Sequence, residues 1–464
     1  MHDYDMIVIG SGPSGRRAAV QTAKIGKSVL VVEKGRQVGG VSVHTGTIPS
    51  KTLRETILNL SGWRERGFYG RSYRVKQDID AQDLLARLRK TLDHEVEVLE
   101  HQFSRNGVKT ARGQGRFVGP HAVEVTDEIG DTHIYNAKNV LVACGTRPYR
   151  PDYVPFNGTN VFDSDEIIDL PKLPRSITVI GAGVIGVEYA TIFNALDVAV
   201  TLIDGRSSFL DFVDREIIEE FTHDLRDRNI ALRLGSDVTS IEANGSGRVN
   251  TKLANGRSIV SDMLLFAAGR VGATEDLNLA AAGLDVDNRG RIVVDARTMQ
   301  TCVPHIYAAG DVIGFPSLAS TSMEQGRVAA CHAFEMAPHP PPEFFPYGIY
   351  SVPEISTVGM SEEEVRKRGI QYECGVARFR ETSRGHIMGL SSGMMKMIFS
   401  TKTRRLLGVH IVGEGATELI HIGQAVLNLK GTIDYFIENT FNYPTLAEAY
   451  KIAGLDAWNR MPTA

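Results

Sequence analysis

Few cysteines and no long apolar run are found in this chain, and both absences limit what it can do. Its four cysteines are scattered through 464 residues and form neither a C-x-x-C pair nor a metal-binding spacing. We expect small buried thiols in a reducing cytoplasm and no metal site. No apolar stretch approaches the roughly 18–20 residues that span a bilayer. Asp3 and Asp5 stand where a signal peptide would be basic, so we expect neither a membrane span nor a secretion signal.

A basic surface is also missing. The formal net charge is −4, and no Lys/Arg cluster alternates with aromatic residues, so nucleic-acid binding is not expected. Apolar residues make up 42% and charged residues 23% of the chain, which is typical of a globular protein. A chain of this length accommodates two or three domains, each with its own core.

A strand–turn–helix–strand pattern opens the chain. Gly10, Gly12 and Gly15 form G-x-G-x-x-G after an apolar strand. In this motif the first glycine permits the tight turn, the second admits a pyrophosphate, and the third lets helix and strand pack closely. Glu33 ends the next strand, where a carboxylate binds ribose hydroxyls. The pattern predicts strands over 6–9 and 28–32 with a helix over 13–24 between them, and so a dinucleotide site.

The same design returns in residues 176–206. Its glycines are Gly181, Gly183 and Gly186, and its acid is Asp204, at the same distance from the last glycine. Two such units predict two dinucleotides. Asp204 suits the 2′-hydroxyl of NAD, whereas Arg206 offers the charge that a 2′-phosphate needs. The pair suits a site for both NAD and NADP, although an exposed loop arginine is the alternative reading of Arg206.

Between the two units, residues 38–55 read VGGVSVHTGTIPSKTLRE. We expect a glycine-rich loop that runs into an amphipathic helix near Ile48. Thr47 is its predicted N-cap, Pro49 fits its first turn, and Lys51 projects from that turn.

This stretch resembles the catalytic segment of the flavin-dependent disulfide reductases, GG-x-C-x4-C-x-P-S-K, but Ser42 and Thr47 occupy its two cysteine positions. Near the C-terminus, FNYPTLAE resembles the family's H-x-H-P-T-x-x-E, with Tyr443 at the position of the catalytic histidine and Glu448 matching the glutamate. The resemblance covers essentially the whole chain. It implies an α/β fold with two Rossmann-like domains, for FAD and NAD(P), and a C-terminal α+β dimerisation domain.

The resemblance also implies domain boundaries and site residues. It places the FAD-binding domain at 1–150 and 271–345, the NAD(P)-binding domain at 151–270 and the dimerisation domain at 346–464, after a Pro-rich linker at 336–346. Implied catalytic residues are Lys51, its partner Glu188, Tyr443 and Glu448. Implied cofactor-binding residues are Gly10, Gly12, Pro13, Ser14, Gly15, Glu33, Lys34, Gly40, Thr47, Gly115, Gly145, Gly181, Gly183, Ile185, Gly186, Asp204, Arg206, Gly269, Asp311 and Ala319, and a helix beginning near Ser317 would face the flavin.

A disulfide reductase needs a thiolate, a second sulfur and a base near neutral pKa. Ser42 and Thr47 lack sulfur, and tyrosine has a reference pKa of about 10. Disulfide reduction is therefore not expected. The chain resembles the soluble pyridine nucleotide transhydrogenases, which share the GTIPSK and FNYPT segments. That likeness implies a cytoplasmic homodimer or larger assembly in which FAD carries a hydride from NADPH to NAD, reversibly. It also implies a ping-pong order, in which NADPH reduces FAD and leaves as NADP before NAD enters the same pocket.

Two other functions fit the missing dithiol. A quinone or dye reductase would dock its acceptor where a disulfide binds in the reductases, beside His44, Thr45 and Tyr443. A flavin-bearing electron-transfer subunit would need a partner-binding appendage, and none is visible in the sequence. Arg384 and His386 lie in a loop-like segment that is either an effector contact or a solvated loop.

Overall fold

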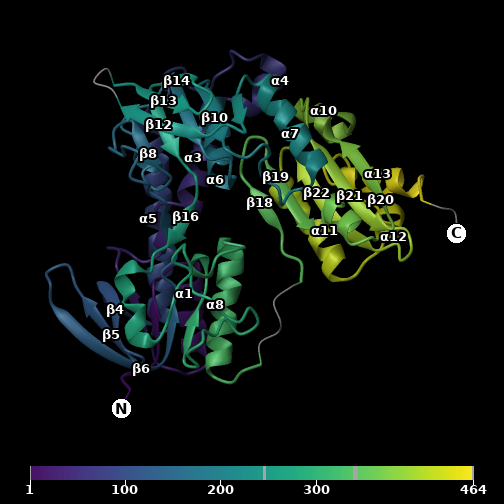
Figure 1. The fold of residues 1–464 in the computed structure, drawn as a ribbon. Helices are drawn as coiled ribbons and strands as arrows, with labels where there is room; N and C mark the ends of the chain where they lie inside the picture. The colour runs from purple at the N-terminus through teal and green to yellow at the C-terminus, as the bar shows by residue number, and fades with distance from the viewer. Residues whose placement is uncertain (1, 244–246, 338–342, 462–464) are drawn as a thin grey trace. The chain divides into compact units, whose positions relative to one another are not determined.

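The computed structural model describes residues 2–243, 247–337 and 343–461. The chain divides into two compact units (Figure 1). Unit 1 comprises Met1–Thr52, Leu85–Tyr149 and Gly269–Pro341, and unit 2 comprises Leu53–Leu84, Arg150–Ala268 and Pro342–Ala464. Both are mixed α/β structures, as the sequence predicts.

Unit 1 is built on a sheet whose central strand, β1 (Tyr4–Ile9), pairs in parallel with β2 (Val29–Glu33) and β6 (Thr132–Val142). Successive β1 residues enter different cores: Met6 and Val8 pack into one apolar cluster, and Ile7 and Ile9 into another. A strand buried on both faces must be continuously apolar, which explains its sequence. The seven strands are β3 (Lys109–Arg112), β2 (Val29–Glu33), β1 (Tyr4–Ile9), β6 (Thr132–Val142), β5 (Ala122–Thr126) and β4 (Gln114–Gly119) in spatial order, with β17 (Ile306–Ala308) also paired to β6.

Two helices of unit 1 pack along each other, α1 and α8. Their close approach leaves no room for a side chain at Gly326, where a Cβ would lie 2.0 Å from the carbonyl oxygen of Ser14. A two-stranded ribbon joins β7 (Thr146–Pro148) to β16 (Arg270–Gly272). The helices that begin in unit 1 or contribute to it are α1 (Pro13–Lys24), α2 (Gly40–His44), α3 (Thr47–Leu60), α5 (Ala81–Arg105) and α8 (Ala319–Ala333).

The predicted strands and helix of the first motif are confirmed to within a residue or two, but two other predictions in unit 1 need correction. The glycine-rich loop expected before the helix near Ile48 contains the short helix α2 (Gly40–His44), which follows Gly39 at a φ of +127°. Thr47 is the first residue of α3, not its N-cap, because the Ser50 N–H already donates to the Gly46 carbonyl. The helix expected near Ser317 is confirmed to within two residues: it begins at Ala319, because Ser317 has a left-handed φ of +49°.

Unit 2 contains a parallel sheet that repeats the motif of unit 1. Its central strand β9 pairs with β10 on one side and β15 on the other. The strands are β11 (Ala231–Leu234), β10 (Ala199–Asp204), β9 (Ser176–Ile180), β15 (Met263–Phe266) and β8 (Val161–Asp163) in spatial order. A three-stranded antiparallel sheet consists of β12 (Val238–Ala243), β13 (Val249–Leu253) and β14 (Ser258–Ser261). The associated helices are α4 (Arg66–Tyr69), α6 (Val184–Ala195) and α7 (Arg215–Asp227).

The C-terminal part of unit 2 is an antiparallel sheet with helices, which confirms the α+β expectation. Its strands are β18 (Tyr347–Ile349), β19 (Ile355–Gly359), β22 (Leu406–Val412), β21 (Met394–Ser400) and β20 (Tyr372–Arg378) in spatial order. Its helices are α9 (Glu362–Lys367), α10 (Ser383–Met388), α11 (Ala416–Asn428), α12 (Ile433–Glu438) and α13 (Glu448–Trp458). The expected loop around Arg384 is thus wrong. Thr382 caps α10 by accepting a hydrogen bond from the Gly385 N–H. Residues 338–342 of the predicted linker lie outside the described residues.

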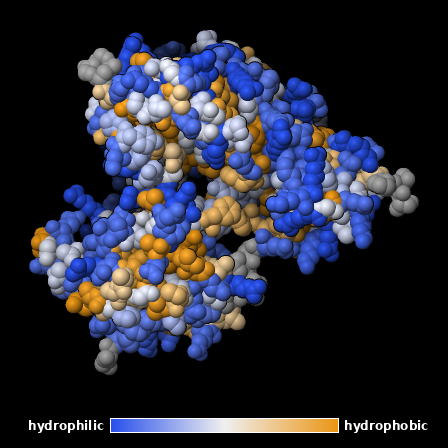
Figure 2. Space-filling view, viewed as in Figure 1, coloured by the Kyte–Doolittle hydropathy of each residue, from blue (hydrophilic) through white to orange (hydrophobic). Residues whose placement is uncertain are grey.

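The face of the molecule in Figure 2 is mainly hydrophilic, with apolar residues gathered in a few patches. In the part of the chain that the structure describes, the helices are too short or too polar to cross a membrane.

Candidate functional site

A pocket in unit 1 lies over the first glycine motif. Gly12 ends the turn before α1, no side chain caps this helix, and a Cβ at Gly12 would meet nothing within 4 Å. The first-turn N–H groups therefore face open space, which suits a pyrophosphate. Gly15 is different, because its Cβ would lie 1.9 Å from the Gly10 carbonyl oxygen. The structure thus shows open space at Gly12 and close packing at Gly15, and the binding of a pyrophosphate at Gly12 stays a prediction.

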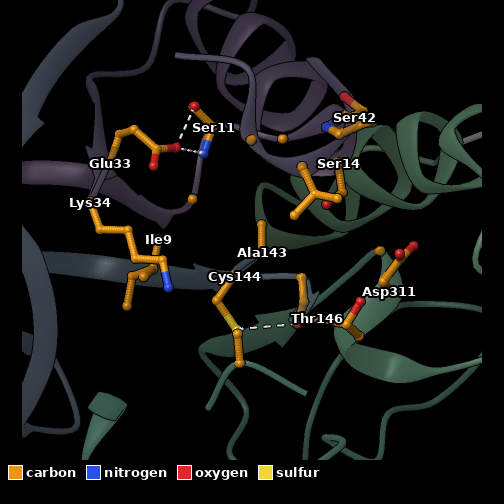
Figure 3. A pocket seen from close by; sticks show the side chains of 18 of the residues that line it. Ile9, Ser11, Ser14, Glu33, Lys34, Ser42, Ala143, Cys144, Thr146 and Asp311 are labelled. Carbon is orange, nitrogen blue, oxygen red and sulfur yellow. Dashed lines mark hydrogen bonds between the residues drawn. The ribbon is translucent and has the colours of Figure 1, made fainter. Parts of the chain in front are cut away.

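Glu33 lies on one side of the pocket as drawn in Figure 3, and Asp311 on the other. One Glu33 oxygen accepts hydrogen bonds from the Ser11 N–H at 2.9 Å and the Ser11 hydroxyl at 2.5 Å. The other accepts the Gly35 N–H at 2.8 Å. These bonds hold the carboxylate at the strand end, where a ribose is expected.

Asp311 follows β17 and begins a short 3-10 helix, Asp311–Ile313. Burial raises the pKa of its carboxyl, although the Arg270 charge and a hydrogen bond with Thr146 act in the opposite direction. Arg270 itself donates to the Thr146 hydroxyl at 2.9 Å. A carboxyl of raised pKa inside the pocket suits hydrogen bonding to hydroxyl groups better than binding of a cation.

The pocket also includes the segment that lacks the dithiol. Ser42 and Thr47 line it, and the Ser42 hydroxyl donates to the Gly39 carbonyl at 3.2 Å. Lys51 lies one helical turn beyond Thr47 on α3, with its ammonium 3.3 Å from the Ser50 hydroxyl. Cys144 lines the pocket too, but burial raises the pKa of its thiol to about 12. A thiol with that pKa is not a nucleophile near neutral pH.

Most residues predicted for the first cofactor come together in this pocket. Gly15 supports it from beneath and does not line it. The sequence reasoning missed Ser11, Cys144, Glu275, Asp276 and Ser322, which also line it. Of these five residues, only Ser11 could have been identified from the sequence, because it lies between the first two glycines of the motif. The predicted residues that line the pocket are Gly10, Gly12, Pro13, Ser14, Glu33, Lys34, Gly40, Thr47, Gly115, Gly145, Asp311 and Ala319.

The second glycine motif, in unit 2, reproduces this geometry. One Asp204 oxygen accepts the Ala182 N–H at 2.7 Å, as Glu33 does from Ser11. The other accepts the Arg206 N–H at 2.9 Å, as Glu33 does from Gly35. A Cβ at Gly183 would meet nothing within 4 Å, so the helix start is open, whereas at Gly186 it would lie 1.8 Å from the Gly181 carbonyl oxygen. Ile185 lies between them in the first turn of α6.

Asp204 has an additional partner that Glu33 lacks. The Arg206 guanidinium donates to both of its oxygens, at 3.0 and 2.9 Å. Burial alone would raise the pKa of Asp204, but these bonds and the backbone N–H groups hold it below its ordinary value. The arginine side chain is 54% exposed and the aspartate side chain 9%. Arg206, the predicted contact of the NADP 2′-phosphate, is therefore hydrogen-bonded to Asp204, the predicted contact of the NAD 2′-hydroxyl.

Three other predicted residues of unit 2 have defined partners. Glu188 is 3% exposed on α6 and accepts the Tyr350 N–H at 2.9 Å. Tyr443 is 68% exposed, and its hydroxyl shares a hydrogen bond with the Ser383 hydroxyl at 2.6 Å. Glu448 accepts the Arg384 N–H at 3.2 Å, so α10 contacts both C-terminal candidates.

Other predicted groupings involve different units. Lys51 belongs to unit 1 and Glu188 to unit 2, so their pairing stays a prediction. Gly269 lies in unit 1, where its carbonyl accepts the Tyr149 N–H at 3.1 Å, and not with the nucleotide residues of unit 2.

Comparison with known proteins agrees with this architecture. The family model described as "Pyridine nucleotide-disulphide oxidoreductase" matches residues 4–326, and its dimerisation domain matches residues 345–453. A Mycobacterium tuberculosis protein named soluble pyridine nucleotide transhydrogenase is 51% identical over 99% of this chain and 98% of its own length. One of the same name from Colwellia psychrerythraea is 41% identical over 99% of each chain.

Solved structures show the same fold. The crystal structure of LpdA from Mycobacterium tuberculosis has a TM-score of 0.89 at 25% identity, covering 97% of this chain and 99% of LpdA. The HOCl-induced flavoprotein disulfide reductase RclA from Escherichia coli has a TM-score of 0.88, also at 25% identity, with coverage of 97% and 99%. FAD and pyridine nucleotides are the cofactors of such proteins, and the two open glycine turns fit two dinucleotides. The chain belongs to the pyridine nucleotide-disulphide oxidoreductase family.

Proposed function

We propose that this protein is a transhydrogenase that moves a hydride from NADPH to NAD⁺, reversibly, without a redox-active disulfide. The observation that carries the proposal is the composition of the unit 1 pocket. Its reductase-like segment presents the hydroxyls of Ser42 and Thr47, and the cysteine that lines it, Cys144, has a raised thiol pKa. Relatives at 51% and 41% identity carry the name soluble pyridine nucleotide transhydrogenase, which supports the proposal.

Each of the two glycine motifs is assigned one cofactor. We assign FAD to residues 1–150 and 271–345, NAD(P) to 151–270, and dimerisation to 346–464. FAD, when bound, supplies a centre that accepts a hydride from one nicotinamide and releases it to another. The chain's own contribution is to bind and orient both dinucleotides. Open N–H groups at Gly12 and Gly183 receive the pyrophosphates, and the carboxylates of Glu33 and Asp204 hold the riboses.

Four other residues are proposed to act closer to the reaction. Lys51, paired with Glu188, places a positive charge beside the flavin and stabilises negative charge there. Tyr443 and Glu448 complete the site of the partner in a homodimer, where the phenol stands in place of a base. The four cysteines are unpaired, as the reducing cytoplasm that we propose for this protein requires.

The use of both nucleotides rests on Asp204 and Arg206. NAD needs the Asp204 carboxylate for its 2′-hydroxyl, and NADP needs the Arg206 guanidinium for its 2′-phosphate. The 2′-hydroxyl of NAD must compete with Arg206 for the Asp204 oxygens, whereas the 2′-phosphate of NADP meets a guanidinium that is already paired with a carboxylate. Neither nucleotide therefore has a site that is ready-made for it alone.

Steady-state kinetics test this function. With NADPH and thio-NAD⁺ both varied, one shared nicotinamide site predicts parallel double-reciprocal lines. Intersecting lines would indicate that both nucleotides bind together, contrary to the proposed ping-pong route, in which NADP⁺ leaves before NAD⁺ binds. Rapid turnover with a quinone and none with thio-NAD⁺ would instead support a quinone reductase.

A further inference from the structure

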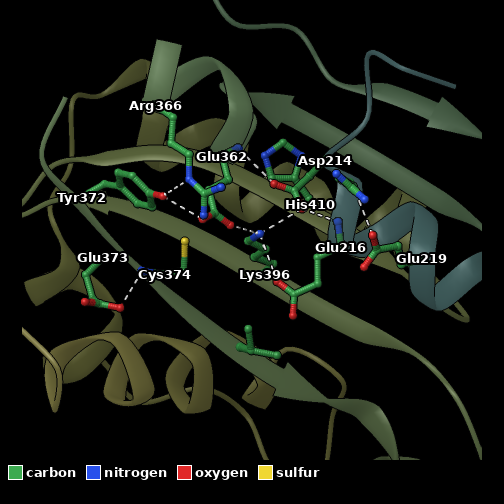
Figure 4. A network of polar contacts seen from close by, with 12 residues as sticks. Asp214, Glu216, Glu219, Glu362, Arg366, Tyr372, Glu373, Cys374, Lys396 and His410 are labelled. Carbon is green, nitrogen blue, oxygen red and sulfur yellow. Dashed lines mark hydrogen bonds and ion pairs between the residues drawn. The ribbon is translucent and has the colours of Figure 1, made fainter. Parts of the chain in front are cut away.

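A buried lysine connects the C-terminal sheet to the nucleotide-binding part of unit 2. Lys396 lies on β21, in a run whose seven residues are all buried, and its side chain is 1% exposed. Figure 4 shows its ammonium among three carboxylates: Asp214 and Glu216 at 3.0 Å each and Glu362 at 2.5 Å. These contacts raise the pKa of Lys396 despite its burial, so it stays charged.

Asp214 is the central acceptor of this cluster, which we call the Lys396 cluster (Lys396, Asp214, Glu216 and Glu362). Its side chain is fully buried and caps α7 by accepting the Glu216 N–H at 3.1 Å. Its second oxygen accepts the Glu362 N–H at the start of α9, at 3.0 Å. Asp214 thus joins α7 to two elements of the C-terminal domain, α9 and β21.

The same aspartate ends the loop that carries Arg206. Residues 205–213 connect β10 to α7, and we call them the β10–α7 loop. Phe209, Leu210 and Val213 of this loop are buried, and the Phe209 ring packs near Phe221 of α7, with centroids 6.4 Å apart. The buried residues of the loop therefore keep a fixed position relative to α7. The first turn of α7 is in turn held by the Lys396 cluster.

Stability alone does not explain a buried lysine at this position. Replacing a buried ion pair by apolar residues of similar size is often neutral or stabilising. In some proteins, buried ionic or polar groups are retained because they specify one arrangement of the elements that they join. At this position, the elements fixed are the C-terminal sheet and the helix that follows the nucleotide loop.

We propose that Lys396 is a positioning residue for nucleotide selectivity. By holding Asp214, it fixes the β10–α7 loop and so the place from which Arg206 reaches a 2′-phosphate. The inference rests on the proposed role of Arg206. It predicts that loss of the lysine charge weakens NADPH more than NADH, because Arg206, the proposed phosphate contact, lies on that loop, whereas Asp204 lies at the end of β10.

The experiment compares Lys396→Met with a matched control. Arg378 of β20 also joins the C-terminal sheet to α7, through Glu220 at 3.3 Å, but it does so two turns away from the loop. Dissociation constants for NADP⁺ and NAD⁺ are measured on the FAD-loaded Lys396→Met and Arg378→Met proteins. Lys396→Met should weaken NADP⁺ about fivefold or more and NAD⁺ by less than about twofold. Arg378→Met should leave the ratio of the two constants unchanged.

A double-mutant cycle separates this inference from the proposed function. In the Arg206→Ala background, Lys396→Met should have no further effect on NADP⁺, since its effect passes through Arg206. If Arg206→Ala alone leaves NADP⁺ binding unchanged, the proposed role of Arg206 fails. If Arg206→Ala weakens NADP⁺ but Lys396→Met shifts both nucleotides equally, or acts unchanged in the double mutant, the inference about Lys396 fails.

A second variant covers the case in which Lys396→Met does not fold. Lys396→Gln keeps a hydrogen-bond donor toward Asp214 and removes the charge. In that protein, amide hydrogen exchange of the β10–α7 loop should be faster than in the wild type, while β1 and α1 of unit 1 exchange as before. Unchanged exchange in the loop would overturn the proposal.

Discussion

Arg206 donates two guanidinium hydrogen bonds to Asp204, the residue that ends the preceding strand. The residue suited to attract a 2′-phosphate thereby neutralises the residue suited to repel it. At the corresponding position of unit 1, Glu33 receives only backbone N–H groups and the Ser11 hydroxyl in the contacts that the structure describes. Asp204 thus has a guanidinium partner that the described contacts of Glu33 do not include, at the position where we propose that nucleotide selectivity is set.

Arg206→Ala should separate the two nucleotides. A charge-assisted hydrogen bond contributes ~1.5–3 kcal/mol, so the KM for NADPH should rise by about tenfold or more. The KM for NADH should stay constant or fall, because each oxygen of Asp204 loses a guanidinium donor and can accept a hydrogen bond from the ribose instead. Steady-state kinetics with each donor measure this. Arg215→Ala, which removes another exposed arginine of unit 2, is the control and should change neither value. Equal weakening of both nucleotides would contradict the role of Arg206.

Asp214 gives a pH-dependent prediction. Burial would raise the pKa of its carboxyl, but His410, the Glu362 N–H and Lys396 together hold it below its ordinary value. A depressed folded-state pKa gives stability that is present above the unfolded value of about 3.9 and lost as pH falls through the folded value. Asp214→Asn should therefore have a lower free energy of unfolding than the wild type at pH 7. The difference between the two proteins should become smaller below about pH 4. Urea unfolding of both proteins at both pH values measures this difference. A difference that becomes larger in acid would contradict the prediction.

Two neighbouring glycines should respond differently to alanine. Gly12→Ala adds a Cβ into open space, so the protein should fold with an unchanged melting temperature of the apoprotein but bind FAD more weakly. Gly15→Ala drives a Cβ into the Gly10 carbonyl and should prevent normal folding of unit 1. Flavin absorbance and thermal melts of both variants measure this. Full flavin content in Gly12→Ala would argue against a pyrophosphate at this turn.

The elements with a strong periodic or motif signal were predictable from the sequence. The range predicted for α1 is the range observed, because the glycine turn and Pro13 mark its start and the apolar spacing marks its face. The short helices were not predictable. α2 depends on Gly39 and α10 on the cap at Thr382, and neither has enough residues to show a period.

The site was predictable in the same uneven way. The acids at the strand ends follow from spacing alone. The pairing of Arg206 with Asp204 required the loop geometry, since residues two apart in sequence meet only where the chain turns. Lys396 could not be assigned at all, because its partners come from α7 and α9, and a lysine in an apolar strand gives no sign of what neutralises it.

The most direct test is a pair of half-reactions followed by stopped-flow absorbance without oxygen. The FAD-loaded protein is mixed with one equivalent of NADPH and then with thio-NAD⁺. Bleaching of the flavin, followed by its recovery in step with thio-NADH formation and without added thiol, is the predicted result. Bleaching that thio-NAD⁺ cannot reverse, but that a quinone reverses rapidly, would contradict hydride transfer between nucleotides.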